Sequence, residues 1–357
     1  MSTVRSLLPA LGASLLCAAG APGEKVAFGP SAGTTLTKTF TTAGEYSLDD
    51  LSLTVDGQDI GQMLGSIEVS LKQGSTIEVT DAYKAFGEGR PTELLRTFDE
   101  LGAKMNMEIS PAQGEVPQFE STSPLEGKTV LFKWNTEKDE YERSFHEGEG
   151  DAELLDGLKE DMDLRIFLPS KEVSAGDSWS VALTELQSVV MPGGDLHLEP
   201  EGQEVNEDAK KMFEGIFEDF RKKLGDLLEG ECKCTFKGTQ GEGDARVAEI
   251  AIEVKVATTL DLAEVLDKAI RAVLEQQDVG AKVDLSLETA DLNFDFDGSG
   301  TLLWNLSAGR LQSFQLGGDI TVDMDLALTV DAEGEHHKVD ASFEMSGTLH
   351  EEVATKE

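Results

Sequence analysis

Basic residues are scarce in this sequence. Its 357 residues include 30 Lys and Arg against 69 Asp and Glu, which gives a formal net charge of −39. Nucleic acids and anionic lipid surfaces are negative themselves, so a chain with this charge is repelled by both. We therefore expect neither as a partner. A solvated, salt-tolerant surface and cationic partners fit this composition better.

Cysteine is rarer still, which excludes a fold held together by several disulfides. The three cysteines are Cys17, Cys232 and Cys234. The last two alternate with Lys233 in CKCTF, so a strand would place both on one face. Their Cα atoms would then lie about 6.6–7 Å apart, which is long for an unstrained disulfide. We predict two buried thiols, with a strained redox pair as the alternative.

Long apolar runs are absent except at the start of the chain. Arg5 is the only charged residue before Glu24, and SLLPALGASLLCAAGAPG lies between them. A charge, an apolar stretch and small residues in this order are typical of a secretory signal peptide. The run contains Pro9 and is short of the ~20 residues that span a bilayer.

The sequence therefore predicts that residues 1–20 are a cleaved signal peptide. We expect the mature chain to be secreted, or resident in the periplasm or cell envelope, and to have no transmembrane segment. Lipidation of Cys17 in place of simple cleavage is left open.

Alternation of apolar and polar residues is the pattern that this sequence has in abundance. From Ile320 to Val330 every second residue is apolar, and the pattern recurs at 67–71, 250–256, 283–287 and 339–345. Such alternation indicates antiparallel strands with one face on a core and one face in water. Glycine-containing segments predict the turns between them. The predicted turns include 72–74, 86–91, 241–244, 297–300, 307–309 and 332–334.

Two segments carry helical rather than strand periodicity. From Asn206 to Leu228 apolar residues follow an i, i+3, i+4 stripe, which is typical of a helix packed on a core. A second stripe runs from about Asp261 to Gln276. We predict an α+β, β-dominated fold of long antiparallel curved sheets or half-barrels, with both amphipathic helices packed on the C-terminal sheet. The Pro- and Gly-rich stretch 191–202 predicts a boundary between a β domain at 25–195 and an α+β domain at 203–357.

Two short motifs resemble catalytic signatures but lack their context. GPSAG at 29–33 fits Gly-x-Ser-x-Gly, yet no buried strand precedes it and no helix follows. LEGKT at 125–129 resembles the end of a phosphate-binding loop, but Thr122 stands where the first glycine belongs and a strand-like segment follows. We interpret neither as a functional motif.

The segment 291–304 is the strongest candidate for binding a metal ion. Asn293, Asp295 and Asp297 have the offsets of a calcium-binding loop, but Trp304 replaces the closing glutamate. A row of carboxylates on a solvated strand explains the pattern equally well, and weak divalent-cation binding is left open. The five histidines show no metal-ligand spacing. The sequence therefore predicts no catalytic, cofactor-binding or metal-binding residue.

Two phrases resemble a known group of sequences. SPLEGKTVLFKW and LPSKEVSAGDSWSV, the latter containing Val173-x-x-Gly176-Asp177-Ser178-Trp179, resemble phrases found in uncharacterised exported bacterial β-rich proteins. The resemblance covers about a fifth of the chain. It implies export and a β-rich fold, and it implies no activity.

These observations lead to an expected function of a general kind. We expect a non-catalytic acidic protein, secreted or in the cell envelope, with a structural or protein-binding role and no cofactor. One alternative is a periplasmic lipid or lipoprotein carrier with an apolar cavity, because a curved sheet covered by an amphipathic helix can enclose one. The other is a carboxylate-dependent hydrolase.

Overall fold

The computed structural model describes residues 23–61, 67–110, 118–148, 150–201, 227–264, 266–268, 271, 283–332 and 335–357. The predicted signal peptide and residues 206–226 of the first predicted helix lie outside these ranges. In the second predicted helix the described residues 263, 264, 266–268 and 271 are helical. There the amide of Leu266 donates to the carbonyl of Leu262 at 2.9 Å.

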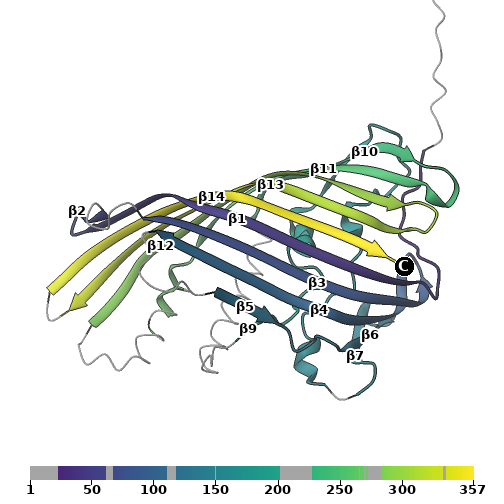
Figure 1. Ribbon diagram of the computed structural model, residues 1–357, viewed down its shortest axis with the longest axis horizontal. Helices are drawn as coiled ribbons and strands as arrows, with labels where there is room; N and C mark the ends of the chain where they lie inside the picture. Colours follow the sequence, from purple (N-terminus) through teal and green to yellow (C-terminus); the bar gives the residue numbers. More distant parts are fainter. Residues whose placement is uncertain are drawn as a thin grey trace, which may run out of the picture.

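The described chain forms one antiparallel sheet of fourteen strands that does not close on itself (Figure 1). Its main path runs β7-β6-β4-β3-β1-β14-β13-β12-β11-β10-β8. The predicted β-dominated antiparallel fold is confirmed. The long strands are β1 (Thr35–Val55), β3 (Glu68–Gly87), β4 (Arg90–Ser110), β10 (Glu229–Gln240), β11 (Val247–Asp261), β12 (Val283–Asn305), β13 (Arg310–Ala332) and β14 (Glu335–Lys356). The short ones are β2 (Gln58–Asp59), β5 (Gln118–Thr122), β6 (Thr129–Asn135), β7 (Glu140–Phe145), β8 (Ser178–Val181) and β9 (Glu199–Pro200).

The first and last long strands lie side by side near the middle of the sheet. β1 pairs with β14 over most of its length, from Thr37 opposite Lys356 to Val55 opposite Val339. Strands from both predicted domains therefore share one set of backbone hydrogen bonds.

Two-residue alternation gives this sheet two chemically different faces. Leu36, Phe40 and Val353 are buried on one face of the sheet, which we call the inner face. Since cross-strand partners share a face, the register carries this assignment from strand to strand. Val353 pairs with Phe314, which in turn pairs with Leu302. The apolar residues predicted to share a face do so throughout β13.

One end of the inner face is covered by the segment 150–198, which Figure 1 shows beneath the strands. This covering segment holds the short turns η1 (Ala152–Leu155), η2 (Arg165–Phe167) and η3 (Leu183–Leu186) and the helix α2 (Gln187–Val190). Leu158, Met162 and Phe167 are buried against the sheet. The Phe167 ring stacks on that of Phe314, with centroids 5.5 Å apart. We call this covered end proximal and the projecting end of β1, β12, β13 and β14 distal.

Glycines on the inner face mark the limit of the covered end. A Cβ on Gly44 would lie 2.7 Å from the Tyr46 hydroxyl oxygen, and one on Gly298 would lie 2.5 Å from the Phe296 ring. Both aromatic rings therefore lie flat over a neighbouring glycine, in the manner known as aromatic rescue. Beyond Tyr46 and Phe296 the partly buried Phe294 and Val322 still pack against the core, and the sheet then extends past it.

Two of the predicted turns are wrong. Residues 297–300 lie inside β12 and residues 72–74 lie inside β3, where the strands continue without reversal. The glycines there have another role. Gly298 faces Gly318 across β12 and β13, where a Cβ on Gly318 would lie 2.5 Å from the Asp297 carbonyl oxygen. Gly298 and Gly300 permit close backbone approach of β13 and do not supply positive φ.

Candidate functional site

The distal end of the inner face is mainly apolar, and the polar residues that the register places there include Gln73 of β3 and His337 of β14. We call this surface the distal face. Along β13 it extends from Val322 to Val330, about 26 Å at the usual rise of a strand. The described residues of the distal face are Leu48, Leu51, Leu53, Val55, Val69, Leu71, Met105, Met107, Ile109, Leu285, Leu287, Leu292, Phe294, Val322, Met324, Leu326, Leu328, Val330, Val339, Ala341, Phe343 and Met345.

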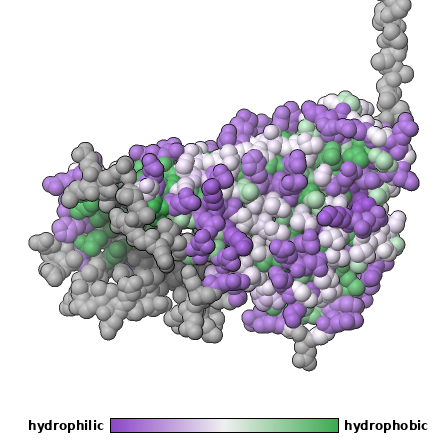
Figure 2. All heavy atoms as spheres, in the orientation of Figure 1, coloured by the Kyte–Doolittle hydropathy of each residue, from purple (hydrophilic) through white to green (hydrophobic). Residues whose placement is uncertain are grey.

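These side chains are less buried than the residues of the core. Leu51 is 39% exposed, Met105 36% and Ile109 37%, whereas Leu36 and Phe314 are fully buried. Figure 2 shows apolar surface at the end of the molecule where β12, β13 and β14 project. Contiguous apolar surface of this kind usually marks a place where another molecule binds. Among the described residues of the distal face none is charged.

The opposite, outer face of the same strands is acidic. Asp291 of β12 lies directly opposite Asp261 on one side and Asp325 on the other, and Asp323 lies opposite Glu344. Like charges in cross-strand pairs are destabilising, so solvent must screen them here. Lys255 offsets one of these negative charges, because its Nζ lies 2.7 Å from a carboxylate oxygen of Asp297.

The predicted carboxylate row on β12 is placed as the alternation indicated, but it does not converge on a point. Asn293, Asp295 and Asp297 follow one another on the outer side of an extended strand. Within the ranges that the structure describes, no three His, Cys, Asp or Glu residues are close enough to hold a metal ion. Weak divalent-cation binding stays a prediction.

A cluster of charged side chains is buried under the proximal end, and sequence analysis did not identify it. Lys38 of β1 contacts Asp81 of β3 at 2.9 Å and Asp163 of the covering segment at 2.7 Å. Arg96 of β4 donates from Nε and Nη2 to the two carboxylate oxygens of Asp81 at 2.7 and 2.8 Å. Tyr83 donates its hydroxyl to Asp163 at 2.8 Å. Lys38, Asp81 and Arg96 have no exposed side-chain surface.

The charges in this buried cluster balance. Burial alone would raise the pKa of Asp81, but Arg96 and Lys38 outweigh it and hold that pKa below its usual range. Arg96 also donates to the backbone carbonyls of Lys159 and Glu160. The cluster therefore joins three strands to the covering segment. Because solvent does not reach it, we interpret it as a structural link and not as a substrate site.

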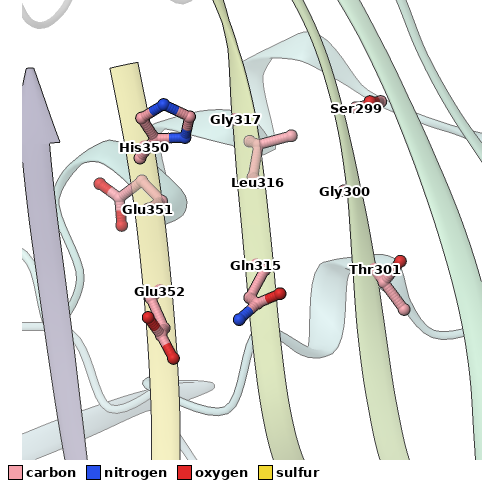
Figure 3. A pocket seen from close by; sticks show the side chains of 9 residues that line it. All are labelled: Ser299, Gly300, Thr301, Gln315, Leu316, Gly317, His350, Glu351 and Glu352. Atoms are coloured by element: carbon pink, nitrogen blue, oxygen red, sulfur yellow. The ribbon is translucent and has the colours of Figure 1, made fainter. Parts of the chain in front are cut away.

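The sheet also has an open hollow of about 550 Å³ across β12, β13 and β14 (Figure 3). Gly317 leaves space there, and the ring of His350 lies over it, with Nδ1 2.5 Å from where a Cβ would be. Alternation places Gln315, His350 and Glu352 on the outer face and turns Glu351 inward. Ser299, Gly300, Thr301 and Leu316 complete the lining.

Glu351 is the carboxylate of this region that burial affects most. It is 8% exposed and accepts one side-chain hydrogen bond, from Thr42 at 2.9 Å. Burial raises the pKa of Glu351 to about 7, against a usual value of 4.5.

This raised pKa predicts that protonation of Glu351 stabilises the fold. Between pH 4.5 and 7 the folded protein keeps a proton that the unfolded chain releases. The protonated Glu351 side chain therefore contributes fully to the free energy of unfolding below pH 4.5, and this contribution is lost as the pH rises through 7. Glu351→Gln removes this titration. From pH 5 to pH 8 its free energy of unfolding should rise by up to about 3 kcal/mol relative to wild type.

Urea denaturation at both pH values measures this difference, with Glu352→Gln on the exposed outer face as the matched control. An unchanged difference between Glu351→Gln and wild type at the two pH values would mean that Glu351 is solvated in the folded protein.

The remaining residues singled out in the sequence take structural positions. Cys232 and Cys234 are buried free thiols on the inner face of β10, as predicted. GPSAG precedes β1 in the loop 29–33, and LEGKT forms the turn that leads into β6. His337 bonds to Asp56 and His336 to Asp331, on separate carboxylates.

Comparisons with known proteins leave the family of the chain open. No helix within the described ranges is long and apolar enough to cross a membrane. No family profile and no curated protein matches the sequence. Among solved structures, the outer membrane protein OprG from Pseudomonas aeruginosa is 8% identical, with 90% of this chain and 97% of that chain covered and a TM-score of 0.19. OpdK from the same organism is 6% identical, with 90% and 99% covered and a TM-score of 0.10.

Proposed function

We propose that this protein is a non-catalytic binding protein that holds the apolar chain of an amphiphile on its distal face. The amphiphile is a lipid or the acyl anchor of a lipoprotein, and the place of action is the cell envelope or the extracellular space. The observation that carries the proposal is the uncharged, partly exposed apolar surface that begins beyond Tyr46 and Phe296.

The shape and chemistry of the distal face suit a flexible hydrocarbon chain. Its lining is almost entirely Leu, Val, Ile, Met and Phe, and methionine adapts to irregular apolar shapes. Each methylene that leaves water contributes about 0.8 kcal/mol, so about ten would give ~8 kcal/mol before the cost of association. A length of about 26 Å along β13 accommodates such a chain without a deep enclosed cavity.

A charge placed on the distal face tests the proposal. Leu326→Glu should weaken binding of the neutral dye Nile red by about ten-fold or more, because a buried carboxylate must stay hydrated or take up a proton. Fluorescence titration of the folded variant measures this. Ala327→Glu, on the outer face of the same strand, is the matched control and should bind within about two-fold of wild type.

Mass spectrometry of the purified protein should also detect bound acyl lipid. Equal Nile red binding by Leu326→Glu and wild type would exclude the distal face as the site. If wild type bound neither Nile red nor lipid, the structural or protein-binding role would be favoured instead.

A further inference from the structure

The distal end combines a mainly apolar inner face with a predominantly acidic outer face. Over residues 46–61, 67–73, 103–110, 283–297, 319–332 and 335–347 the chain has eighteen Asp and Glu. The basic residues in the same ranges are Lys72, Lys104 and Lys338. Alternation places the charged residues of the central strands outward, so a ligand on the distal face lies against a single layer of sheet backed by carboxylates.

The negative field of these carboxylates reaches the distal face. A sheet is one layer thick, so only its backbone separates the side chains on its two faces. The Debye length is about 10 Å at 0.1 M salt, so solvent ions screen this field only partly. The interior of a sheet also screens less than water does.

Acidic residues also lie at the ends of the strands that form the distal face. Asp56 lies in the turn at the end of β1, where its carboxylate accepts a hydrogen bond from the backbone amide of Lys338 at 2.9 Å and contacts His337 at 2.8 Å. Glu288 of β12 accepts a hydrogen bond from Thr329, on the outer face of β13, at 2.9 Å. Glu108, near the end of β4, lies opposite Ser70 on the outer face. A head group that protrudes in any of these directions meets carboxylates.

We infer that the distal face selects amphiphiles whose head group is positively charged, such as an alkylammonium, over those with a carboxylate or phosphate head. This inference rests on the proposed function and adds the class of ligand. The apolar face supplies the affinity for the chain, and the charge asymmetry decides which head group is tolerated at its border. An anionic head would meet net repulsion at the distal end, where the described ranges hold eighteen acidic and three basic residues.

Displacement of Nile red from wild-type protein by three dodecyl amphiphiles, each below its micelle concentration, tests the inference. They are dodecyltrimethylammonium, the neutral dodecyl maltoside and laurate. At 10 mM NaCl the ammonium should reach half-displacement at about a ten-fold lower concentration than laurate, with the maltoside between them. At 1 M NaCl, where the Debye length is about 3 Å, the difference should fall to within about two-fold.

A variant in which acidic residues of the outer face are replaced by lysine separates the effect of their charge on the head group from binding of the apolar chain. Asp291→Lys, Asp323→Lys and Asp325→Lys together should reduce the preference for the ammonium by about three-fold or more. Nile red affinity should stay within about two-fold of wild type, because the distal face is unchanged. Tetramethylammonium, which has the head group without the chain, should displace no dye.

The outcomes distinguish the two proposals. Laurate displacing the dye as well as the ammonium at low salt would overturn the inference and leave the proposed function standing. A preference that persists at 1 M NaCl or in the triple variant would also overturn it. Failure of wild type to bind Nile red would overturn both.

Discussion

Replacing Asp81 with asparagine should lower the free energy of unfolding by about 3–5 kcal/mol. The substitution keeps the size of the side chain and removes its charge. Lys38 and Arg96 would then share one carboxylate, Asp163, which contacts Lys38 and not Arg96 in the present arrangement. An uncompensated cation without access to water is among the most destabilising changes a single substitution can make.

Urea denaturation at neutral pH measures this loss. Asp297→Asn is the matched control, because it makes the same change in an ion pair with Lys255 whose side chains are 64% and 65% exposed. The control should cost at most about 1 kcal/mol. If Asp81→Asn does not fold, Tyr83→Phe tests the same cluster through one lost hydroxyl and should cost about 1–3 kcal/mol. Values near zero for both variants would show that the cluster is hydrated.

Replacing Phe167 with alanine should cost about 3–5 kcal/mol, the usual range for a large buried aromatic residue. Phe167 and Phe314 are both fully buried, and their rings are nearly parallel at an interplanar angle of 17°. The contact joins the covering segment to the middle of the sheet. Its loss leaves a cavity at the point where these two parts of the core meet.

Thermal and urea unfolding of Phe167→Ala report this cost. Val190→Ala, at the end of α2 in the same covering segment, is the control because Val190 is 69% exposed. It should change stability by less than about 0.5 kcal/mol. A loss at Phe167 as small as that at Val190 would argue that the covering segment is not packed on the sheet through this ring.

Three members of the buried cluster stand at positions where the alternation of the sequence predicts core residues. Lys38 stands between Leu36 and Phe40, and Arg96 stands between Leu94 and Phe98, so both occupy positions that alternation assigns to the core. Asp81 has the corresponding place on β3. A charge at a core position must be paired, and opposite charges at such positions on neighbouring strands predict one another. What no local pattern indicates is Asp163, because it comes from an irregular segment.

Glycine was the residue type whose role the sequence left ambiguous. The turns at 86–91 and 307–309 are formed as predicted, and Gly89 and Gly309 there have the positive φ that tight reversals use. Gly298 and Gly74 lie within continuous strands instead. A glycine that permits reversal and one that permits close approach of a neighbouring strand look the same until the strand partners are known.

By itself, the sequence determined that this chain forms long antiparallel strands with one wet face, because two-residue alternation depends only on the geometry of an extended backbone. It also determined the acidity of the outer face. Only the tertiary structure decided that β1 lies beside β14 in one sheet, that the covering segment buries one end of its inner face, and that the distal face lies beyond it. Those outcomes depend on contacts between residues far apart in the chain, which no local spacing encodes.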